Sequence, residues 1–261
     1  MNIIRRYFNA LSYDEKESLR VIKNSFWKIN WIKTLWFNLS ILPFKKAIKC
    51  PVLVAYNVKV KSIGKIIFKN NIYSGMISIG VIRISAIETN HNPTIFNNRG
   101  TLTFAGRVKM HPGSILTIVP NSSISLGNHV GFGANTKVIC RKAIEIGNDV
   151  RISWNCQILD SDFHFLYNID KNKYYQRTKE IMIGNDVFIG NGCTVGKGTI
   201  IPNGCVVSCI SKVSGDFRTE GENLLIAGNP AKIIKKGINI SNGWYPEEEN
   251  EISKRIENEH K

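Results

Sequence analysis

The chain has 261 residues, of which 43% are hydrophobic, and this is enough material for one large core. Its 35 Lys and Arg outnumber 20 Asp and Glu, which gives a formal net charge of +15 and excludes a strongly acidic protein. The six cysteines include no C-x-x-C pair, so small buried thiols in a reducing compartment are expected instead of disulfides or a metal site.

The positive charge is concentrated near the N-terminus. Residues 1–70 hold 14 Lys and Arg against 3 acidic residues. A basic segment of this kind can bind nucleic acid or an anionic membrane surface, or it can increase solubility. No nucleic-acid-binding module is recognisable, so nucleic acid is not expected as a partner. Asp14 to Glu17 interrupt the basic start before any apolar run, so a signal peptide is not expected either.

Residues 26–44 are rich in Trp, Phe and Leu, and Lys45 and Lys46 follow directly. Lysines interrupt the run, and it is short for a transmembrane helix, which needs about 20 apolar residues. Residues 1–51 are therefore predicted to form a basic, aromatic-rich cap, with helices that cover the open end of a solenoid. A second interpretation, compatible with the first, is that residues 26–46 lie on a membrane surface.

An aliphatic residue recurs at every sixth position near the C-terminal end, at Ile183, Ile189, Val195, Ile201, Val207 and Val213. The residue after each is small or Pro, and a compact side chain follows four positions after the first five, at Val187, Cys193, Thr199, Cys205 and Ser211. Neither a helix nor a single strand has this period. Short parallel strands wound into a coil, with one inward residue on each flat face, would produce it.

The same period occurs upstream in three shorter runs: Phe104, Met110, Leu116; Leu126, Phe132, Val138; and Ile146, Ile152, Ile158. We therefore predict a parallel β-helix over residues 52–233, with irregular opening coils in residues 52–100. Residues 234–261 are predicted to be a charged tail. It holds six Glu after Pro246 and is expected to be a short solvated helix or a disordered end.

Three segments resemble the hexapeptide-repeat acyltransferases, which include galactoside, maltose and serine O-acetyltransferases. They are Ile-Gly-Asn-Asp-Val-Arg-Ile at 146–152, Ile-Gly-Asn-Asp-Val-Phe-Ile-Gly at 183–190, and Ala-Gly-Asn-Pro-Ala-Lys-Ile at 227–233. The segment Lys33 to Val54 resembles acetyltransferases linked to bacterial surface polysaccharides. The resemblance implies an all-β, left-handed parallel β-helix, a homotrimer and acetyl-CoA as the donor. Left-handedness comes from the resemblance alone, because spacing carries no information about it.

The repeat has one large interruption. Ile183 follows Ile158 by 25 positions, where regular winding needs six. A polar loop, residues 159–182, is therefore predicted to protrude from the solenoid, and loops on rigid scaffolds are where function concentrates.

His164 lies in this loop, with Asp160 and Asp162 nearby. Transfer of an acyl group to a hydroxyl needs a base with a pKa near neutrality, and imidazole meets that requirement. The resemblance assigns His164 the role of base, because the galactoside and maltose enzymes carry their catalytic His on a loop at this point. Asp160 or Asp162 is predicted to orient the ring. The other histidines, His91, His111, His129 and His260, lie before the clear repeat, at a coil corner or in the tail.

The resemblance also implies a groove between subunits for the pantetheine arm. Its predicted donor-binding residues here are Phe188, Gly190, Asn191, Cys209, Ser214 and Lys232, the last as a charge for CoA phosphates. Phe188 stands where Trp is common in the family. Gly215 follows Ser214 at a position where the family often has a Lys after the Thr or Ser. Cys209 is expected to be a packing residue and not a nucleophile.

Predicted acceptor-binding residues precede the loop. Asn135 matches an Asn of the galactoside enzyme's acceptor pocket, although a corner Asn in left-handed conformation is an equal alternative. Trp154 and Asn155 are the other candidates, with Trp154 either stacking on a sugar ring or filling a subunit seam. Cys140 and Arg141 replace acidic residues of that enzyme, so a different acceptor is expected.

The favoured function is a cytoplasmic O-acetyltransferase that acts on a sugar hydroxyl of a surface polysaccharide or its precursor. Under the second interpretation of residues 26–46, it lies at the inner face of the membrane. The expected reaction is direct attack in a ternary complex, without a metal. One alternative is an N-acetyltransferase that acts on an amino-sugar nucleotide. A zinc-dependent β-helix carbonic anhydrase is disfavoured because no His pair has a ligand spacing. A non-catalytic trimeric scaffold is the remaining alternative.

Overall fold

The computed structural model describes residues 11–82, 92–240 and 246–259. Residues 1–10 of the predicted cap lie outside the described residues, as do residues 241–245 and 260–261 of the predicted tail. His91 and His260 are also outside them.

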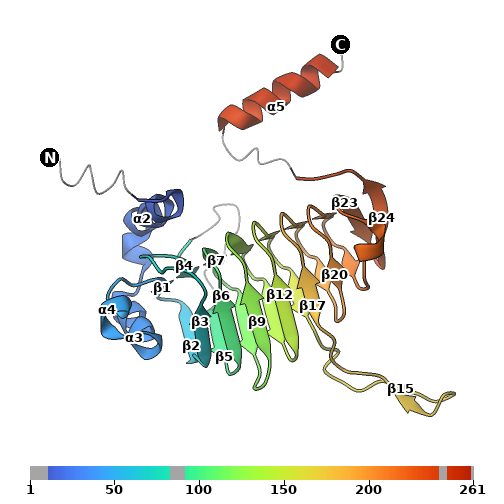
Figure 1. Cartoon of the computed structure of the whole chain (residues 1–261), viewed down its shortest axis with the longest axis horizontal. Helices are drawn as coiled ribbons and strands as arrows, with labels where there is room; N and C mark the ends of the chain where they lie inside the picture. Colours follow the sequence, from blue (N-terminus) through green and yellow to red (C-terminus); the bar gives the residue numbers. More distant parts are fainter. Residues whose placement is uncertain (1–10, 83–91, 241–245, 260–261) are drawn as a thin grey trace.

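The chain winds into a three-sided prism in which each side is one sheet (Figure 1). The first sheet consists of β1 (Val52–Val54), β4 (Ile77–Ile79), β7 (Val108–Met110), β10 (Val130–Phe132), β13 (Arg151–Ile152), β18 (Phe188–Ile189), β21 (Val206–Val207), β23 (Leu224–Gly228) and β24 (Ala231–Lys236). The second consists of β2 (Val58–Ser62), β5 (Thr94–Asn98), β8 (Ile115–Ile118), β11 (Lys137–Cys140), β14 (Gln157–Leu159), β19 (Thr194–Val195) and β22 (Lys212–Val213). The third consists of β3 (Lys65–Phe68), β6 (Thr101–Phe104), β9 (Ser123–Leu126), β12 (Ala143–Ile146), β17 (Ile181–Ile183) and β20 (Ile200–Ile201).

The six-residue period corresponds to one face of the prism. Ile183 on the third sheet pairs with Ile201 one full coil later, and Ile189 on the first sheet pairs in the same way with Val207. These aliphatic side chains are almost completely buried. The period therefore arises because each face contributes one inward side chain that stacks on the same position of the next coil.

The compact residues that follow each repeat lie inside the corners. Val187, Cys193 and Cys205 are fully buried, which confirms the predicted inward cysteines. Thr199 is also fully buried, and its hydroxyl lies 2.6 Å from the carbonyl of Gly196 and 3.1 Å from that of Val213. A small polar residue is tolerated there because the backbone supplies its hydrogen-bond partners.

The opening coils follow the same architecture. β1 pairs in parallel with β4, β2 with β5 and β3 with β6, so the described strands of residues 52–100 already belong to the three sheets. One irregularity is the connection at 69–76 between β3 and β4, which is longer than the corresponding turns of later coils. We name the corners first-to-second, second-to-third and third-to-first after the sheets that they join.

The solenoid ends in a hairpin, which the repeat did not anticipate. β23 continues the parallel first sheet, whereas β24 runs antiparallel to it. The segment 227–233 of the family resemblance contains the turn between these strands. A short helix η2 (Arg218–Glu220) precedes the hairpin, and helix α5 (Pro246–Glu259) confirms the predicted C-terminal helix.

Helices cover the other end of the prism, which confirms the predicted cap (Figure 1). They are α2 (Tyr13–Ser25), η1 (Phe26–Lys28), α3 (Trp31–Ile41) and α4 (Phe44–Ala47). The Phe37 ring of α3 packs edge-on against Phe96, with 5.3 Å between the ring centroids. The Asn38 amide of α3 donates to the carbonyl of Val52 at 2.7 Å and accepts from its N–H at 3.1 Å. The cap thus closes both the apolar core and the free edge of β1.

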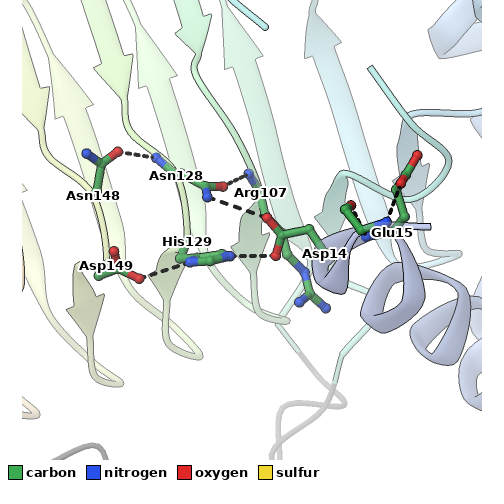
Figure 2. Close-up of polar contacts among 8 residues, drawn as sticks. Asp14, Glu15, Arg107, Asn128, His129, Asn148 and Asp149 are labelled. Carbon is green, nitrogen blue, oxygen red and sulfur yellow. Dashed lines mark hydrogen bonds and ion pairs between the residues drawn. The ribbon is translucent and has the colours of Figure 1, made fainter. Parts of the chain in front are cut away.

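Helix α2 contacts the third-to-first corner through Asp14 (Figure 2). The imidazole of His129 lies between two carboxylates, with Nε2 2.6 Å from Asp14 and Nδ1 2.9 Å from Asp149. Next to it, Asn128 accepts from the N–H of Arg107 at 2.7 Å. His129 therefore connects the cap to the coils, and a structural role accounts for it. No helix among the residues that the structure describes is both long and apolar enough to cross a membrane.

Candidate functional site

A groove of about 430 Å³ runs along the first-to-second corner and the adjoining second sheet. Two of its corner residues, Asn135 and Asn155, adopt left-handed backbone conformations, with φ of 58° and 57°. The groove is lined by Asn92, Pro93, Ile95, Gly113, Ile115, Asn135, Lys137, Asn155 and Gln157. The structure thus brings together two of the three predicted acceptor residues.

The outer face of the second sheet forms the floor of this groove. Ile95, Ile115, Lys137 and Gln157 occupy successive strands in register, each directly opposite the next. The floor is therefore apolar at one end and polar at the other, a combination that suits a sugar ring with its C–H and hydroxyl groups. None of these four was predicted, although each precedes an inward repeat residue and so had to face outward.

Asn135 has an unsatisfied acceptor in the groove. Its side-chain Oδ1 is buried and has no hydrogen-bond partner among the described residues. A Cβ on Gly113 would overlap that oxygen, so glycine leaves the space that the amide occupies. A buried carbonyl without a partner is costly, and a ligand hydroxyl or amine would relieve it.

Trp154 is not part of the groove lining. Its side chain is 38% exposed, and its backbone carbonyl accepts from the N–H of Gly192 at 3.0 Å. It lies at the same corner as Asn155, on the outside of the coil. Its exposed indole is available to a ligand or to a second subunit, and the two predicted roles of Trp154 both stay predictions.

The interruption of the repeat forms an ordered arm, residues 160–180, at the second-to-third corner. Its tip is a two-stranded ribbon of β15 (Tyr167–Asn168) and β16 (Lys173–Tyr174). At its base, Ser161 pairs with Thr178, and the N–H of Asp162 donates to the carbonyl of Arg177 at 3.0 Å. The arm projects well away from the prism (Figure 1).

His164 lies near the base of this arm and is exposed. Its backbone N–H donates to the carbonyl of Asp162 at 2.8 Å, whereas its side chain has no hydrogen-bond partner among the described residues. The Arg177 guanidinium lies 4.6 Å from the centroid of the Phe165 ring and holds the next residue in place. An accessible imidazole without a partner can bind and release a substrate proton.

The two aspartates predicted to orient His164 have other partners. Asp162 forms an ion pair with Lys197 of the next coil. Asp160 is completely buried, and its two oxygens accept from the backbone N–H groups of Arg141 and Lys142, both at 2.7 Å. In a single chain, therefore, neither carboxylate contacts the imidazole.

Asp160 fastens the base of the arm instead. The thiol of Cys140 donates to its Oδ2 at 3.4 Å, and its backbone carbonyl accepts from the N–H of Lys179 at 3.0 Å. Burial raises the pKa of Cys140 to about 12, and the charge of Asp160 adds to this effect. Cys140 thus remains a thiol at neutral pH and contributes a hydrogen bond to the carboxylate.

Most of the predicted donor residues gather on the last coils, at the first-to-second corner. Phe188 faces outward on β18, and Gly190, Asn191 and Cys209 follow at the corner. A Cβ on Gly190 would come within 2.7 Å of the Cys209 nitrogen, so glycine is needed for the close stacking of the coils. Cys209 lies in the turn after β21 and is exposed, so it is not packed into the core of the single chain. Its predicted place in a groove between subunits stays a prediction.

Ser214 and Lys232 are separated from that group. Ser214 lies at the second-to-third corner, on the same side of the prism as the arm, and Lys232 is exposed on β24 opposite Ala227. Within one chain, the imidazole of His164 and the groove of Asn135 thus belong to different corners. Among the described residues, no group of three or more His, Cys, Asp or Glu could hold a metal ion.

His111 lies directly after β7 and belongs to a regular coil, not to the stretch before the repeat. Its Nδ1 is buried and has no hydrogen-bond partner among the described residues. Burial and, to a smaller extent, the charge of Lys109 lower the pKa of His111 to about 4, against the opposing effect of a hydrogen bond with the Ile82 backbone.

This low pKa predicts a pH-dependent stability. Because the folded chain holds His111 neutral while an unfolded chain protonates it near pH 6.5, its contribution is present above that pH and is lost as the pH falls towards 4. Between about pH 7.5 and 4.5, we expect the wild type to lose about 2 kcal/mol more unfolding free energy than His111→Gln. Urea denaturation at both pH values measures this difference, and equal losses in the two proteins would contradict the assignment.

No family model matches the chain. An uncharacterized 24.8 kDa protein in the cps region of Klebsiella pneumoniae is 37% identical over 198 residues, which cover 76% of this chain and 85% of that protein. The crystal structure of the polySia specific acetyltransferase NeuO superposes with a TM-score of 0.50 at 22% identity, covering 76% of this chain and 99% of NeuO. The polysialic acid O-acetyltransferase OatWY has a TM-score of 0.45 at 22% identity, covering 73% and 90%. The likeness to NeuO confirms the left-handed parallel β-helix fold.

Proposed function

The chain belongs to the family of the Klebsiella cps-region protein and has the hexapeptide-repeat β-helix fold, and from this premise we propose that it is an acetyl-CoA-dependent O-acetyltransferase. Its acceptor is a sugar hydroxyl of a surface polysaccharide or its precursor. The name of NeuO supports a glycan acceptor, because it specifies polySia. We place the reaction in the cytoplasm, where acetyl-CoA is available.

The observation that carries the proposal is the arm with the exposed imidazole of His164, which has no hydrogen-bond partner among the described residues. A rigid solenoid is interrupted there by 21 residues, 160–180, that are anchored by a buried carboxylate and present one histidine near the prism surface. Such an arrangement positions a base without tying up its proton-binding atoms.

In the proposed reaction, His164 takes the proton of the acceptor hydroxyl while that oxygen attacks the thioester carbonyl carbon. The C–O bond forms, and a tetrahedral intermediate develops whose negative oxygen is held by backbone N–H groups. The C–S bond then breaks, and the departing CoA thiolate recovers the proton from the imidazolium. The products are the acetyl ester and CoA, and no covalent enzyme intermediate is needed.

We propose that the site forms between two copies of the chain in a homotrimer. The arm of one copy would bring His164 to the groove of the next, where Asn135, Asn155 and Lys137 bind the acceptor. The separation of these groups on different corners of one prism supports this assembly. Rotational symmetry would then create one equivalent site at each interface.

For the donor, we propose that Phe188 provides a flat apolar wall for the pantetheine arm. Gly190, Asn191 and Cys209 would form the adjoining corner, and Ser214 would contribute from the neighbouring copy. Lys232 would pair with a CoA phosphate, since its exposed ammonium is free of ion pairs among the described residues.

Calorimetric titration with acetyl-CoA tests this proposal. We expect micromolar binding at about one site per chain, unaffected by a chelator, and about tenfold weaker binding in Lys232→Glu, because one lost phosphate contact is worth about 1.4 kcal/mol. Lys254→Glu in α5 carries the same charge change away from the proposed groove and should bind like the wild type. No binding at millimolar acetyl-CoA would instead favour a scaffold without catalytic function.

A further inference from the structure

Helix α3 presents an apolar stripe to solvent. Ile32, Leu35, Trp36 and Leu39 recur at the spacing of one helix face, and all four are exposed, Ile32 to 86% and Trp36 to 50%. A surface helix of a water-soluble protein normally carries polar side chains on its outer face. The outer face of α3 therefore needs a different explanation from its inner face.

The opposite face of α3 already performs the cap function. Thr34, Phe37 and Asn38 are buried against the first coil and satisfy both its core and its backbone. The outer stripe contributes nothing to that contact, so the folding of the prism does not account for it. The cap explains one face of this helix, and the other face has no partner among the residues that the structure describes.

Exposed apolar side chains also occur on the elements that flank α3 in the sequence. Trp27 of η1 is 89% exposed, and Phe44 of α4 and Ile48 directly after α4 are 68% and 53% exposed. α3 and α4 lie side by side at the N-terminal end of the prism (Figure 1). We call this group the aromatic patch; it comprises Trp27, Ile32, Leu35, Trp36, Leu39, Phe44 and Ile48. Large exposed apolar patches mark interaction surfaces.

Positive charge surrounds the aromatic patch. Residues 18–82 contain 11 Lys and Arg and no Asp or Glu. Four of these lysines, Lys28, Lys45, Lys46 and Lys49, are exposed next to patch residues in η1, α4 and the turn after it. No salt bridge involves these four lysines among the described residues. Their charges are thus available to an anionic partner.

We propose that the aromatic patch and its lysines bind the surface of a bilayer that contains anionic phospholipids. Trp, Phe and Leu side chains partition into the interface between headgroups and acyl chains, while the lysines pair with the phosphates. α3 has 11 residues and is about 16 Å long, too short for a hydrocarbon core of about 30 Å, so it lies in the interface and does not cross it.

Charge makes the bilayer a better partner than a second copy of the chain. A symmetric contact would place the same patch of each copy face to face and bring the lysines of both copies together. Like charges in that arrangement repel, whereas phospholipid phosphates attract them. Helices α3 and α4, which carry five of the seven patch residues, lie at the N-terminal end of the prism (Figure 1), so a contact there leaves most of the length of the prism for contacts between subunits.

Sedimentation with vesicles tests the proposal on the purified full-length chain. We expect the chain to bind phosphatidylcholine vesicles that contain phosphatidylglycerol. Its affinity for vesicles of phosphatidylcholine alone should be lower by about tenfold or more, and added salt should reduce this difference. Equal binding to both vesicles, or binding to neither, would overturn the proposal and favour a protein partner for the patch. The measurement involves no acetyl transfer, so either result leaves the proposed enzyme function untouched.

Two variants identify the surface responsible. The double variant Trp27→Gln/Trp36→Gln removes two exposed rings, and the double variant Lys45→Glu/Lys46→Glu reverses two charges. Each double variant should weaken binding to anionic vesicles by about tenfold or more. The matched controls are Ile169→Gln, an 83% exposed residue at the tip of the arm, and Lys235→Glu with Lys254→Glu at the C-terminal end. If the controls weakened binding as much as the patch variants, a general charge or hydrophobic effect would replace the proposal.

Discussion

Replacing His164 by alanine is expected to slow acetyl transfer by about 10²–10⁴-fold, the usual contribution of a general base. The reason is that the imidazole is exposed and its side chain has no hydrogen bond within the described part of the chain, so it can accept the acceptor proton directly. The affinity for acetyl-CoA should stay within about twofold of the wild type, because four of the proposed donor residues, Phe188, Gly190, Asn191 and Cys209, lie at another corner of the prism and not on the arm. Initial rates of thiol release, with an oligosaccharide acceptor found by screening, measure the first effect, and calorimetry measures the second.

Ile169→Ala provides the matched control for His164→Ala. Ile169 lies at the tip of the same arm and is 83% exposed, so its truncation changes the arm without removing the imidazole. It should retain nearly the full rate. A His164→Ala protein that keeps wild-type activity would remove this residue from the mechanism, and transfer to an amine but not to a hydroxyl would point to the N-acetyltransferase alternative.

Replacing Asp160 by alanine is expected to lower the free energy of unfolding by about 3 kcal/mol, since two charge-assisted hydrogen bonds are lost and their donors stay partly buried. The side chain is completely buried, and it holds Arg141 and Lys142 of one coil while its backbone holds Lys179. The arm should therefore loosen at its base. Urea denaturation measures the stability, and limited proteolysis measures the exposure of the arm.

Asp162→Ala is the matched control two residues away. Its ion pair with Lys197 is partly exposed to solvent, and such a pair contributes at most about 1 kcal/mol. Asp160→Asn should fall between the two, because an amide can accept only one of the two backbone hydrogen bonds. Equal losses in Asp160→Ala and Asp162→Ala would show that the buried carboxylate does not fasten the arm.

The sequence indicated most of the solenoid because the six-residue pattern is a direct consequence of how the coils pack. Ile183, Ile189 and Val195 recur every six residues since each fills one face of one coil, and the coil above repeats the requirement. The arm was visible for the same reason, as the one place where the period fails for 25 positions. Likewise, the apolar run of residues 26–44 indicated the cap.

The positions of the candidate functional residues relative to one another depend on the register between coils, which the repeat alone does not give. The groove floor of Ile95, Ile115, Lys137 and Gln157 exists because residues about 20 positions apart become neighbours in the second sheet. A family resemblance indicated Asn135, and Asn155 was a candidate because it lies one coil before the arm. The sequence could not show that Lys137 shares their groove or that Trp154 does not. The outward positions carry no periodic constraint, because solvent accepts almost any side chain there.

By itself, therefore, the sequence determined the winding, the covered end and the position of the arm, since these follow from burial that repeats along the chain. The tertiary structure alone decided which partners the polar groups find. Asp160 accepts hydrogen bonds from the backbone of the preceding coil and does not contact His164. Asp14 contacts His129, which is 115 positions away in the sequence. Hydrogen bonds and ion pairs are short-range and directional, so only the folded geometry selects among the many pairings that the composition allows.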